Sequence, residues 1–253
     1  MYEWSWEPDD FAALWYSESN DRIPNILRYT SRFEYVDEFE AHKVAVRNRY
    51  SSEEFERIQL ALHTLSTSDM RIAVLGGTSR YRNSDGTQGV YRIIGARNDF
   101  HAAVLHQVTQ GERDGLYRLR LCRPENLPAQ VAQTIPARSP GKQAPITVHP
   151  AELRENRQSR TGNSPAERYR RLLAPRGEGS GSARLLVGAF NADPRALNVV
   201  QWYDVEDGRY LELRGEHITV RPAADRDLAE RFAGWIDTAV RRIREYEEEY
   251  ERW

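Results

Sequence analysis

Apolar side chains recur every three to four residues in three stretches of the first 136 residues, a spacing typical of amphipathic helices. The first stretch, Phe11–Tyr16, follows Asp9 and Asp10, one of which is expected to cap a short helix. The second begins at Ser51 or Ser52 with acidic residues close behind, as in a capping box. The positions that should face the core are Phe11, Leu14 and Trp15; Phe55, Ile58, Leu62 and Leu65; and Leu127, Val131 and Ile135.

Between the second and third of these helices, apolar and polar residues alternate with a period of two, which favours strands. The predicted strands are Arg71–Leu75, Val90–Gly95, His101–Val108 and Leu116–Leu121. The polar segment Gly76–Gly89 is expected to be a mobile loop, and Asp114-Gly115 a hairpin turn. Parts of Phe33–Arg49 also alternate and are interpreted as strand-like, at Phe33, Tyr35, Val44 and Val46.

The second half of the chain follows a stretch with four prolines, Pro136–Pro150, which predicts a connection between two halves. Ser164-Pro165 is a good helix start, and the chain ends in a long amphipathic helix from about Asp225. Strands are predicted between these helices at Ala183–Phe190, Asn198–Tyr203, Arg209–Leu213 and Ile218–Val220. The segments expected to be softest are Gly76–Gly89, Ser139–Gln143 and Asn156–Gly162, and the run Gly177–Ser182 is also expected to be flexible.

The two halves share one order of signals: helix, glycine-rich segment, strands, Asp-Gly turn, strand, Arg-Pro pair and helix. This repeat predicts an α+β fold with a pseudo-two-fold internal duplication and one central antiparallel sheet. Residues 51–136 and 164–236 should then superpose. Two unrelated α+β segments remain the alternative. The predicted organisation is a single domain over 1–253, with an N-terminal half (1–136), a connection (137–163) and a C-terminal half (164–253).

Composition narrows the possible functions. The 253 residues carry 36 Lys and Arg against 38 Asp and Glu, so the formal net charge is −2 and no basic excess indicates nucleic-acid binding. Only Lys43 and Lys142 are lysines, a bias that favours a GC-rich genome. The lone Cys122 allows no internal disulfide. The acidic start lacks the pattern of a secretory signal, and no apolar run approaches the ~20 residues that span a bilayer, so membrane insertion is not expected.

Residue types that carry catalysis or bind metals do not gather in the sequence. The six histidines show no metal-ligand spacing, and His101 and His106 would point to opposite faces of a strand. No Gly-x-Ser-x-Gly elbow occurs, and Gly76–Ser79 lacks the lysine and the helix of a phosphate-binding loop. We therefore predict no catalytic, cofactor-binding or metal site.

Three stretches resemble the EspG family of proteins associated with type VII (ESX) secretion. They are Trp6–Trp15 (WEPDDFAALW), Leu172–Gly179 (LLAPRGEG), and Trp202–Leu211 (WYDVEDGRYL) followed by Ile218–Ala224. The resemblance implies a pseudo-two-fold α+β fold whose central sheet is flanked by helical bundles. It also implies an actinobacterial, cytoplasmic chaperone without enzymatic activity.

The same resemblance implies a partner: a PE–PPE-like helical secretion substrate, with components of the ESX machinery as further partners. Family members grip the apolar tip of the PPE subunit with the sheet face and the C-terminal helical bundle. On this chain the candidate partner-binding residues are Phe190, Trp202 and Tyr210, expected on one sheet face, and Trp235 on the terminal helix. Core positions under the helices are the alternative for each of them. Apolar burial should dominate, so salt should weaken the complex little.

Two other functions stay open on the sequence alone. A small-molecule-binding or hydrolytic α+β enzyme would use a pocket lined by Trp202, Tyr203, Asp204 and His217. A scaffold would assemble through a coiled coil formed by the terminal helix, Asp225–Trp253. A pocket with converging titratable groups would favour the enzyme, and a flat or shallow apolar sheet surface would favour the chaperone.

Overall fold

The computed structural model describes residues 2–18, 20–83, 86–109, 114–154, 162–173, 177–190 and 194–250. The N-terminal half contains β1 (Tyr2–Trp6), α1 (Pro8–Trp15), α2 (Val36–Arg47), α3 (Ser52–Thr67), β2 (Met70–Arg82), β3 (Gln88–Arg97), β4 (Ala102–Thr109), β5 (Tyr117–Cys122), η1 (Pro124–Asn126) and α4 (Leu127–Thr134). The connection (137–163) contains β6 (Ile146–Val148) and α5 (Pro150–Arg154), and the C-terminal half contains α6 (Pro165–Leu173), β7 (Gly179–Val187), β8 (Ala196–Val205), β9 (Gly208–Arg214), β10 (Ile218–Pro222) and α7 (Asp225–Tyr250).

Both halves contribute to one antiparallel sheet of ten strands, in the order β1-β5-β4-β3-β2-β7-β8-β9-β10-β6. The central pair is β2 and β7, which run antiparallel from Met70 opposite Val187 to Thr78 opposite Gly179. Outward from this pair the order is the same on both sides: four consecutive strands, then the strand that comes before those four in the chain. The α+β class and the single central sheet are confirmed, whereas superposition of 51–136 on 164–236 stays a prediction.

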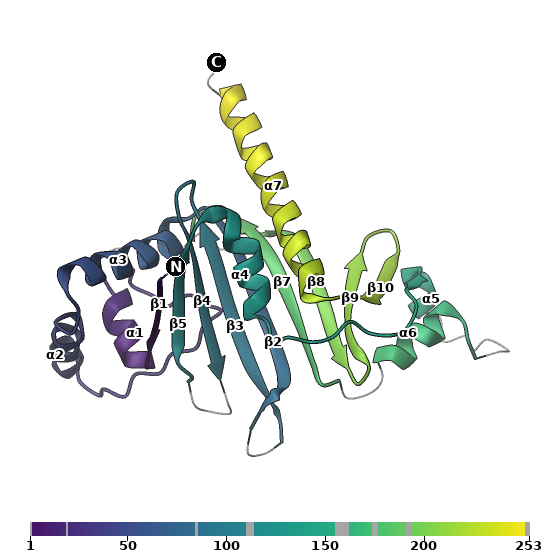
Figure 1. The fold of residues 1–253 in the computed structure, drawn as a ribbon, viewed down its shortest axis with the longest axis horizontal. Helices are drawn as coiled ribbons and strands as arrows, with labels where there is room; N and C mark the ends of the chain where they lie inside the picture. Colours follow the sequence, from purple (N-terminus) through teal and green to yellow (C-terminus); the bar gives the residue numbers. More distant parts are fainter. Residues whose placement is uncertain are drawn as a thin grey trace.

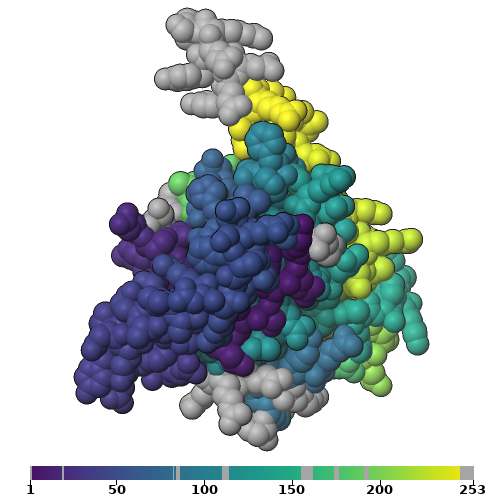
Figure 2. Space-filling view, turned by 60° about the vertical axis from the view of Figure 1, so that its left-hand side comes forward, coloured from purple at the N-terminus to yellow at the C-terminus, as the bar shows by residue number. Residues whose placement is uncertain are grey.

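Helices cover the two faces of the sheet differently. On one face, which we call the covered face, α4 and α7 pack over the centre of the sheet (Figure 1). On the other face, which we call the open face, α1 and α3 pack over β3–β5, and α6 packs over β6 and β8. No helix of the described chain packs on the open face of β2 and β7. Figure 2 shows the N-terminal helices, in purple and blue, standing out from the body.

The loop expected over Gly76–Gly89 is shorter than predicted, because residues 76–82 belong to β2 and residues 88–89 to β3. Of the run expected to be flexible at Gly177–Ser182, residues 179–182 belong to β7. Aromatic rings from neighbouring strands occupy the space that side chains at these glycine positions would fill. A Cβ atom on Gly76 would lie 2.2 Å from the Tyr91 ring, and one on Gly181 would lie 2.3 Å from the Trp202 ring. The glycines therefore let two large rings fill the core, where Trp202 Nε1 donates a 3.2 Å hydrogen bond to the Tyr91 hydroxyl.

The strand-like interpretation of Phe33–Arg49 was wrong, since α2 occupies Val36–Arg47. Its spacing is helical when Phe39, His42 and Val46 are taken together, because these residues lie three and four positions apart. His42 Nε2 lies 2.8 Å from the carboxylate of Asp10 on α1. The predicted Asp cap is also wrong: α1 begins after Glu7 without a side-chain cap, and Asp10 instead binds α2.

The connection between the halves is bonded along the sheet, against the expectation of a soft segment at Ser139–Gln143. Arg209 N donates to Ser139 O at 2.8 Å, and Gly141 N donates to Arg209 O at 3.0 Å. The Tyr210 hydroxyl accepts from Gln143 N at 2.9 Å. Most of Asn156–Gly162 lies outside the described residues, so its expected softness stays a prediction.

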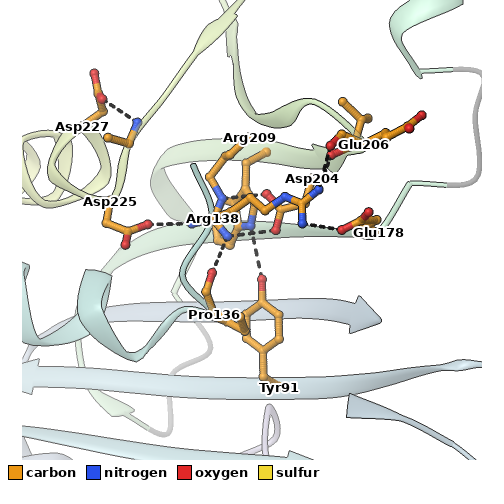
Figure 3. A network of polar contacts seen from close by, with 12 residues as sticks. Tyr91, Pro136, Arg138, Glu178, Asp204, Glu206, Arg209, Asp225 and Asp227 are labelled. Carbon is orange, nitrogen blue, oxygen red and sulfur yellow. Dashed lines mark hydrogen bonds and ion pairs between the residues drawn. The ribbon is translucent and has the colours of Figure 1, made fainter. Parts of the chain in front are cut away.

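A buried arginine joins the connection, β8, β9 and the start of α7 (Figure 3). The Arg209 side chain is fully buried and binds both carboxylate oxygens of Asp204, at 2.7 and 2.9 Å. It also donates to Pro136 O at 2.6 Å and to Asp225 at 3.1 Å. Burial alone would lower the pKa of Arg209, but the hydrogen bonds and charge of Asp204 outweigh it and raise that pKa.

Candidate functional site

The four residues predicted to bind a partner lie in different parts of the molecule. Trp202 and Tyr210 are 0% and 1% exposed, and Trp235 is 7% exposed and packs beside Phe232 at a ring-centroid distance of 5.6 Å. All three are core side chains in this conformation. Phe190 is partly buried and lies next to Trp15, with ring centroids 6.1 Å apart. Of the four, Phe190 alone reaches the exposed middle of the sheet.

Strand register explains why the residues expected on one face are separated. Trp202 lies opposite Leu211, and Tyr203 lies opposite Tyr210. Because successive side chains of a strand point to opposite faces, Trp202 and Tyr210 lie on different faces. Trp202 belongs to the core under α4 and α7, and Tyr210 to the core under α6. The expectation that Phe190, Trp202 and Tyr210 share a face was therefore wrong.

The pocket expected for the enzyme alternative is not assembled. The buried Asp204 is paired with Arg209, and its neighbour Tyr203 points to the opposite face. His217 is exposed and lies beside His149, with ring centroids 5.4 Å apart. These side chains share no cavity in the described structure. Among the described residues, no group of three His, Cys, Asp or Glu side chains could hold a metal ion.

The middle of the open face exposes aliphatic side chains. On β2, Ile72 and Val74 are buried towards the covered face, while Ala73 and Leu75 point the other way, and Leu75 is 46% exposed. Val199 of β8 lies opposite Arg184 of β7 and is 52% exposed. Helices flank this surface at both ends of the sheet but leave its centre bare. Exposed aliphatic surface on a sheet is a common feature of partner-binding sites.

A groove of about 810 Å³ lies on this surface, on the side that faces the N-terminal half of the protein. Its floor is the open face of β2 and β7, and one wall is the loop Asp21–Ile26 that follows α1. The other lining residues are Ile94 on β3 and residues from the end of β7 to the start of β8. The full lining is Asp21, Arg22, Ile23, Pro24, Asn25, Ile26, Arg71, Ala73, Leu75, Ile94, Ser182, Arg184, Leu186, Phe190, Pro194, Arg195 and Ala196.

One buried arginine holds the end of the groove in place. Arg71 is 4% exposed and donates to Ser68 O, at the end of α3, and to Gly188 O, at 3.0 and 3.2 Å. Its guanidinium lies 4.9 Å from the centre of the Phe190 ring. Burial lowers the pKa of Arg71. This contact ties the segment after β7 to the N-terminal helices, so the groove edge is rigidly supported.

The remaining arginines of the groove are exposed. Arg22 lies 3.9 Å from Asp21, a long contact with both side chains more than three-quarters exposed. Arg184 and Arg195 are exposed, and no carboxylate of the described chain lies within ion-pair distance of either. Among the described residues, Asp21 is the single acidic residue that lines the groove. The described part of the groove therefore combines aliphatic side chains with exposed arginines, Arg184 on its floor and Arg22 and Arg195 at its edges.

Sequence reasoning missed this groove because its residues come from four distant segments. The alternation Ala183-Arg184-Leu185 does indicate that Arg184 points away from the core. Nothing in the local pattern shows that the loop around Arg22 lies across from it. That proximity depends on the pairing of β2 with β7, which the sequence does not specify residue by residue.

Comparison with known proteins decides the family. The sequence profile of the EspG family matches residues 7–233. The chain belongs to the EspG family. The resemblance noted in the sequence is thereby confirmed, and it extends over both halves of the sheet. None of the curated proteins shows a significant sequence match to this EspG-family chain.

Solved structures agree on the fold of this EspG-family chain. The type VII secretion chaperone EspG5 of Mycobacterium tuberculosis, solved in complex with a PE25–PPE41 dimer, superposes with a TM-score of 0.53 at 14% identity. The match covers 90% of this chain and 93% of that one. HtdX of the same organism reaches a TM-score of only 0.20 at 12% identity, over 88% of this chain and 100% of that one, which supports no argument. Within the described residues, no helix is both long and apolar enough to cross a bilayer.

Proposed function

We propose that this chain is a cytoplasmic chaperone of type VII secretion, without enzymatic activity, that binds a PE–PPE-like helical substrate before export and keeps it soluble. Family membership over residues 7–233 supports the class. The exposed aliphatic centre of the open face is the observation that carries the binding role, because no helix of the described chain covers it. We further propose that residues 1–136 and 164–253 act as two structurally equivalent halves around it.

The physical role follows from the properties of such clients. An exposed apolar end of a helical substrate drives aggregation until it is covered. Burial on the chaperone contributes about 25 cal/mol per Å² of apolar surface, before the costs of association are subtracted. Leu75 and Val199 lie on rigid strands and lose little freedom on binding. They replace the buried Trp202 and Tyr210 as our proposed partner-binding residues, with Phe190 retained at the groove edge.

Co-expression tests this proposal. A PE–PPE-like pair encoded beside this gene should be recovered as a soluble complex with the chain and should aggregate when expressed alone. Val199→Glu should abolish recovery of the complex, because it places a charge in the apolar contact. Val44→Glu is the matched control, since Val44 is 60% exposed on α2, away from the open centre. Equal recovery with both variants would contradict the proposed surface, and failure of every neighbouring pair to co-purify would contradict the function.

A further inference from the structure

Arginines on the open face differ in whether the chain itself supplies their partners. On β3, Arg92 donates to the Thr109 hydroxyl at 2.6 Å, and on β9, Arg214 is paired with Glu212 at 2.5 Å. Arg71 is satisfied by main-chain carbonyls. By contrast, Arg184 at the middle of the groove and Arg195 at its edge have no carboxylate partner within the described residues. The chain as a whole has a formal charge of −2, so this positive rim is a local feature.

Aliphatic side chains surround Arg184 on the floor of the groove. Ala73, Leu75 and Leu186 line it, and Ile23 and Ile26 form the wall opposite β7. A polyanion such as RNA would find little to stack on, because Phe190, the one aromatic ring among the described residues of the groove, already contacts the Arg71 guanidinium. The ligand that matches such a groove combines an apolar surface with carboxylates beside it.

We propose that the groove binds a client helix end that carries acidic side chains next to its apolar tip, with Arg184 as the central charge contact and Arg22 and Arg195 at the rim. This proposal rests on the proposed function and names the chemistry of the client. The groove's volume of about 810 Å³ accommodates several side chains of a helix end. An arginine fork also recognises a carboxylate with a defined geometry, which helps to set the register of the client.

This inference changes the expected effect of salt. Apolar burial alone would leave affinity nearly independent of ionic strength. Charge contacts at an exposed rim are screened as the Debye length falls from about 10 Å at 0.1 M salt to about 3 Å at 1 M. We therefore expect affinity to fall severalfold between 50 and 500 mM NaCl, with the apolar contribution remaining at high salt.

The test uses the full chain and the PE–PPE-like pair that co-purifies with it, measured by titration calorimetry at both salt concentrations. Arg184→Glu should weaken binding at least tenfold at 50 mM NaCl and by a smaller factor at 500 mM. Arg123→Glu, at an exposed position after β5, is the matched control and should bind like the wild type. Arg195→Glu should show the same trend as Arg184→Glu and serves as a second variant if Arg184→Glu lowers the thermal midpoint.

The outcomes separate the two proposals. Wild-type affinity for both Arg184→Glu and Arg195→Glu, with binding lost in Val199→Glu, would overturn the acidic-client inference and leave the chaperone function standing. If none of the three variants weakened binding, both the acidic-client inference and the proposed apolar binding surface would be overturned. Displacement of the client by a single-stranded 12-mer RNA would assign the groove to a polyanion and overturn the inference. The free protein should be monomeric in light scattering, and self-association that Arg184→Glu abolishes would assign the groove to a second copy instead.

Discussion

The two faces of the sheet use arginine in opposite ways. On the covered face, Arg209 has no exposed side-chain surface, and two carboxylates and a carbonyl satisfy it. On the open face, Arg184 is exposed, and its cross-strand neighbour is the exposed Val199. The two arginines differ because a helix covers one of them and not the other. The helix α7 begins beside Arg209 and buries it, whereas no described helix lies over Arg184.

This contrast separates residues that hold the fold from residues that are free for a partner. A buried charge must be paired inside the chain, because its desolvation is costly. An exposed arginine adds little to stability, and its contacts can be made with another molecule. Apolar residues differ in the same way. Trp202 is buried and stabilises the core, whereas Leu75 is about half exposed and contributes less to the stability of the fold. The following variants test this separation, from the largest expected effect to the smallest.

Arg209→Met should have the largest effect. It leaves Asp204 buried without its partner, and breaking a buried pair in this way costs about 3–5 kcal/mol. Urea unfolding should show this loss in the free energy of unfolding. The double variant Arg209→Met/Asp204→Leu should recover much of it, because no unpaired charge remains. A loss below about 1 kcal/mol in the single variant would show that Arg209 is not the structural pair described here.

Trp202→Ala should destabilise the protein by about 3–5 kcal/mol, since it opens a cavity beneath α4 and α7. Leu75→Ala, on the opposite face, is the comparison and should cost less than about 1 kcal/mol because Leu75 is 46% exposed. Thermal midpoints measured by circular dichroism distinguish the two. If both variants lowered the midpoint equally, the open face would be packed in solution.

Stability should also fall with acidification through His106. Burial, with Arg118 and Arg120 nearby, lowers the pKa of His106 to about 4. Between pH 6.5 and 4 the unfolded chain then binds a proton that the folded chain does not, so stability decreases as pH falls through this window. The expected loss from pH 7.5 to pH 5 is about 2 kcal/mol, taking an unfolded pKa of about 6.5.

His106→Gln should remove this part of the pH dependence, and His63→Gln, at an exposed position of α3, should not. Urea unfolding of the three proteins at pH 7.5 and pH 5 provides the measurement. An unchanged pH dependence in His106→Gln would mean that His106 is solvated in the folded protein.

Arg184→Gln should have the smallest effect on stability, within about 0.5 kcal/mol of the wild type, because an exposed side chain without an internal pair is removed. Its thermal midpoint should therefore match that of Arg242→Gln. A marked destabilisation would reveal an internal partner for Arg184 and would weaken the assignment of this residue to a client.

Local signals predicted most of the secondary structure. Ser164 caps α6 as expected: its hydroxyl accepts from Glu167 N at 3.3 Å, and Ser164 N donates to the Glu167 carboxylate at 2.8 Å. Ser51 likewise accepts from Glu54 N at 3.3 Å. Alternation located most of the strands, since one face of each contacts the core. These features depend on neighbours within a few residues, which is why they can be recognised in the sequence.

Other features depend on distant residues and escaped the same reasoning. Gly76 is in a strand because the ring of Tyr91 needs its space, and glycine alone favours a loop in any local interpretation. The strand β1 was missed because its pairing with β5 joins Tyr2 to Leu121 across most of the N-terminal half. The groove likewise forms only when the loop around Arg22 lies across from β7. Which predicted site residues are buried depends on the order of the strands and on which helices pack over them, and neither is visible in the local sequence.

The most direct test of the central claim compares client binding by two Val→Glu variants, one in the open centre of the sheet and one on α2. Titration calorimetry with the co-purified PE–PPE-like pair should show that Val199→Glu loses binding while its thermal midpoint stays at the wild-type value. Val44→Glu, at an exposed position outside the open centre, should bind as the wild type does. Wild-type affinity in a folded Val199→Glu would contradict the claim that the open face of the sheet receives the client.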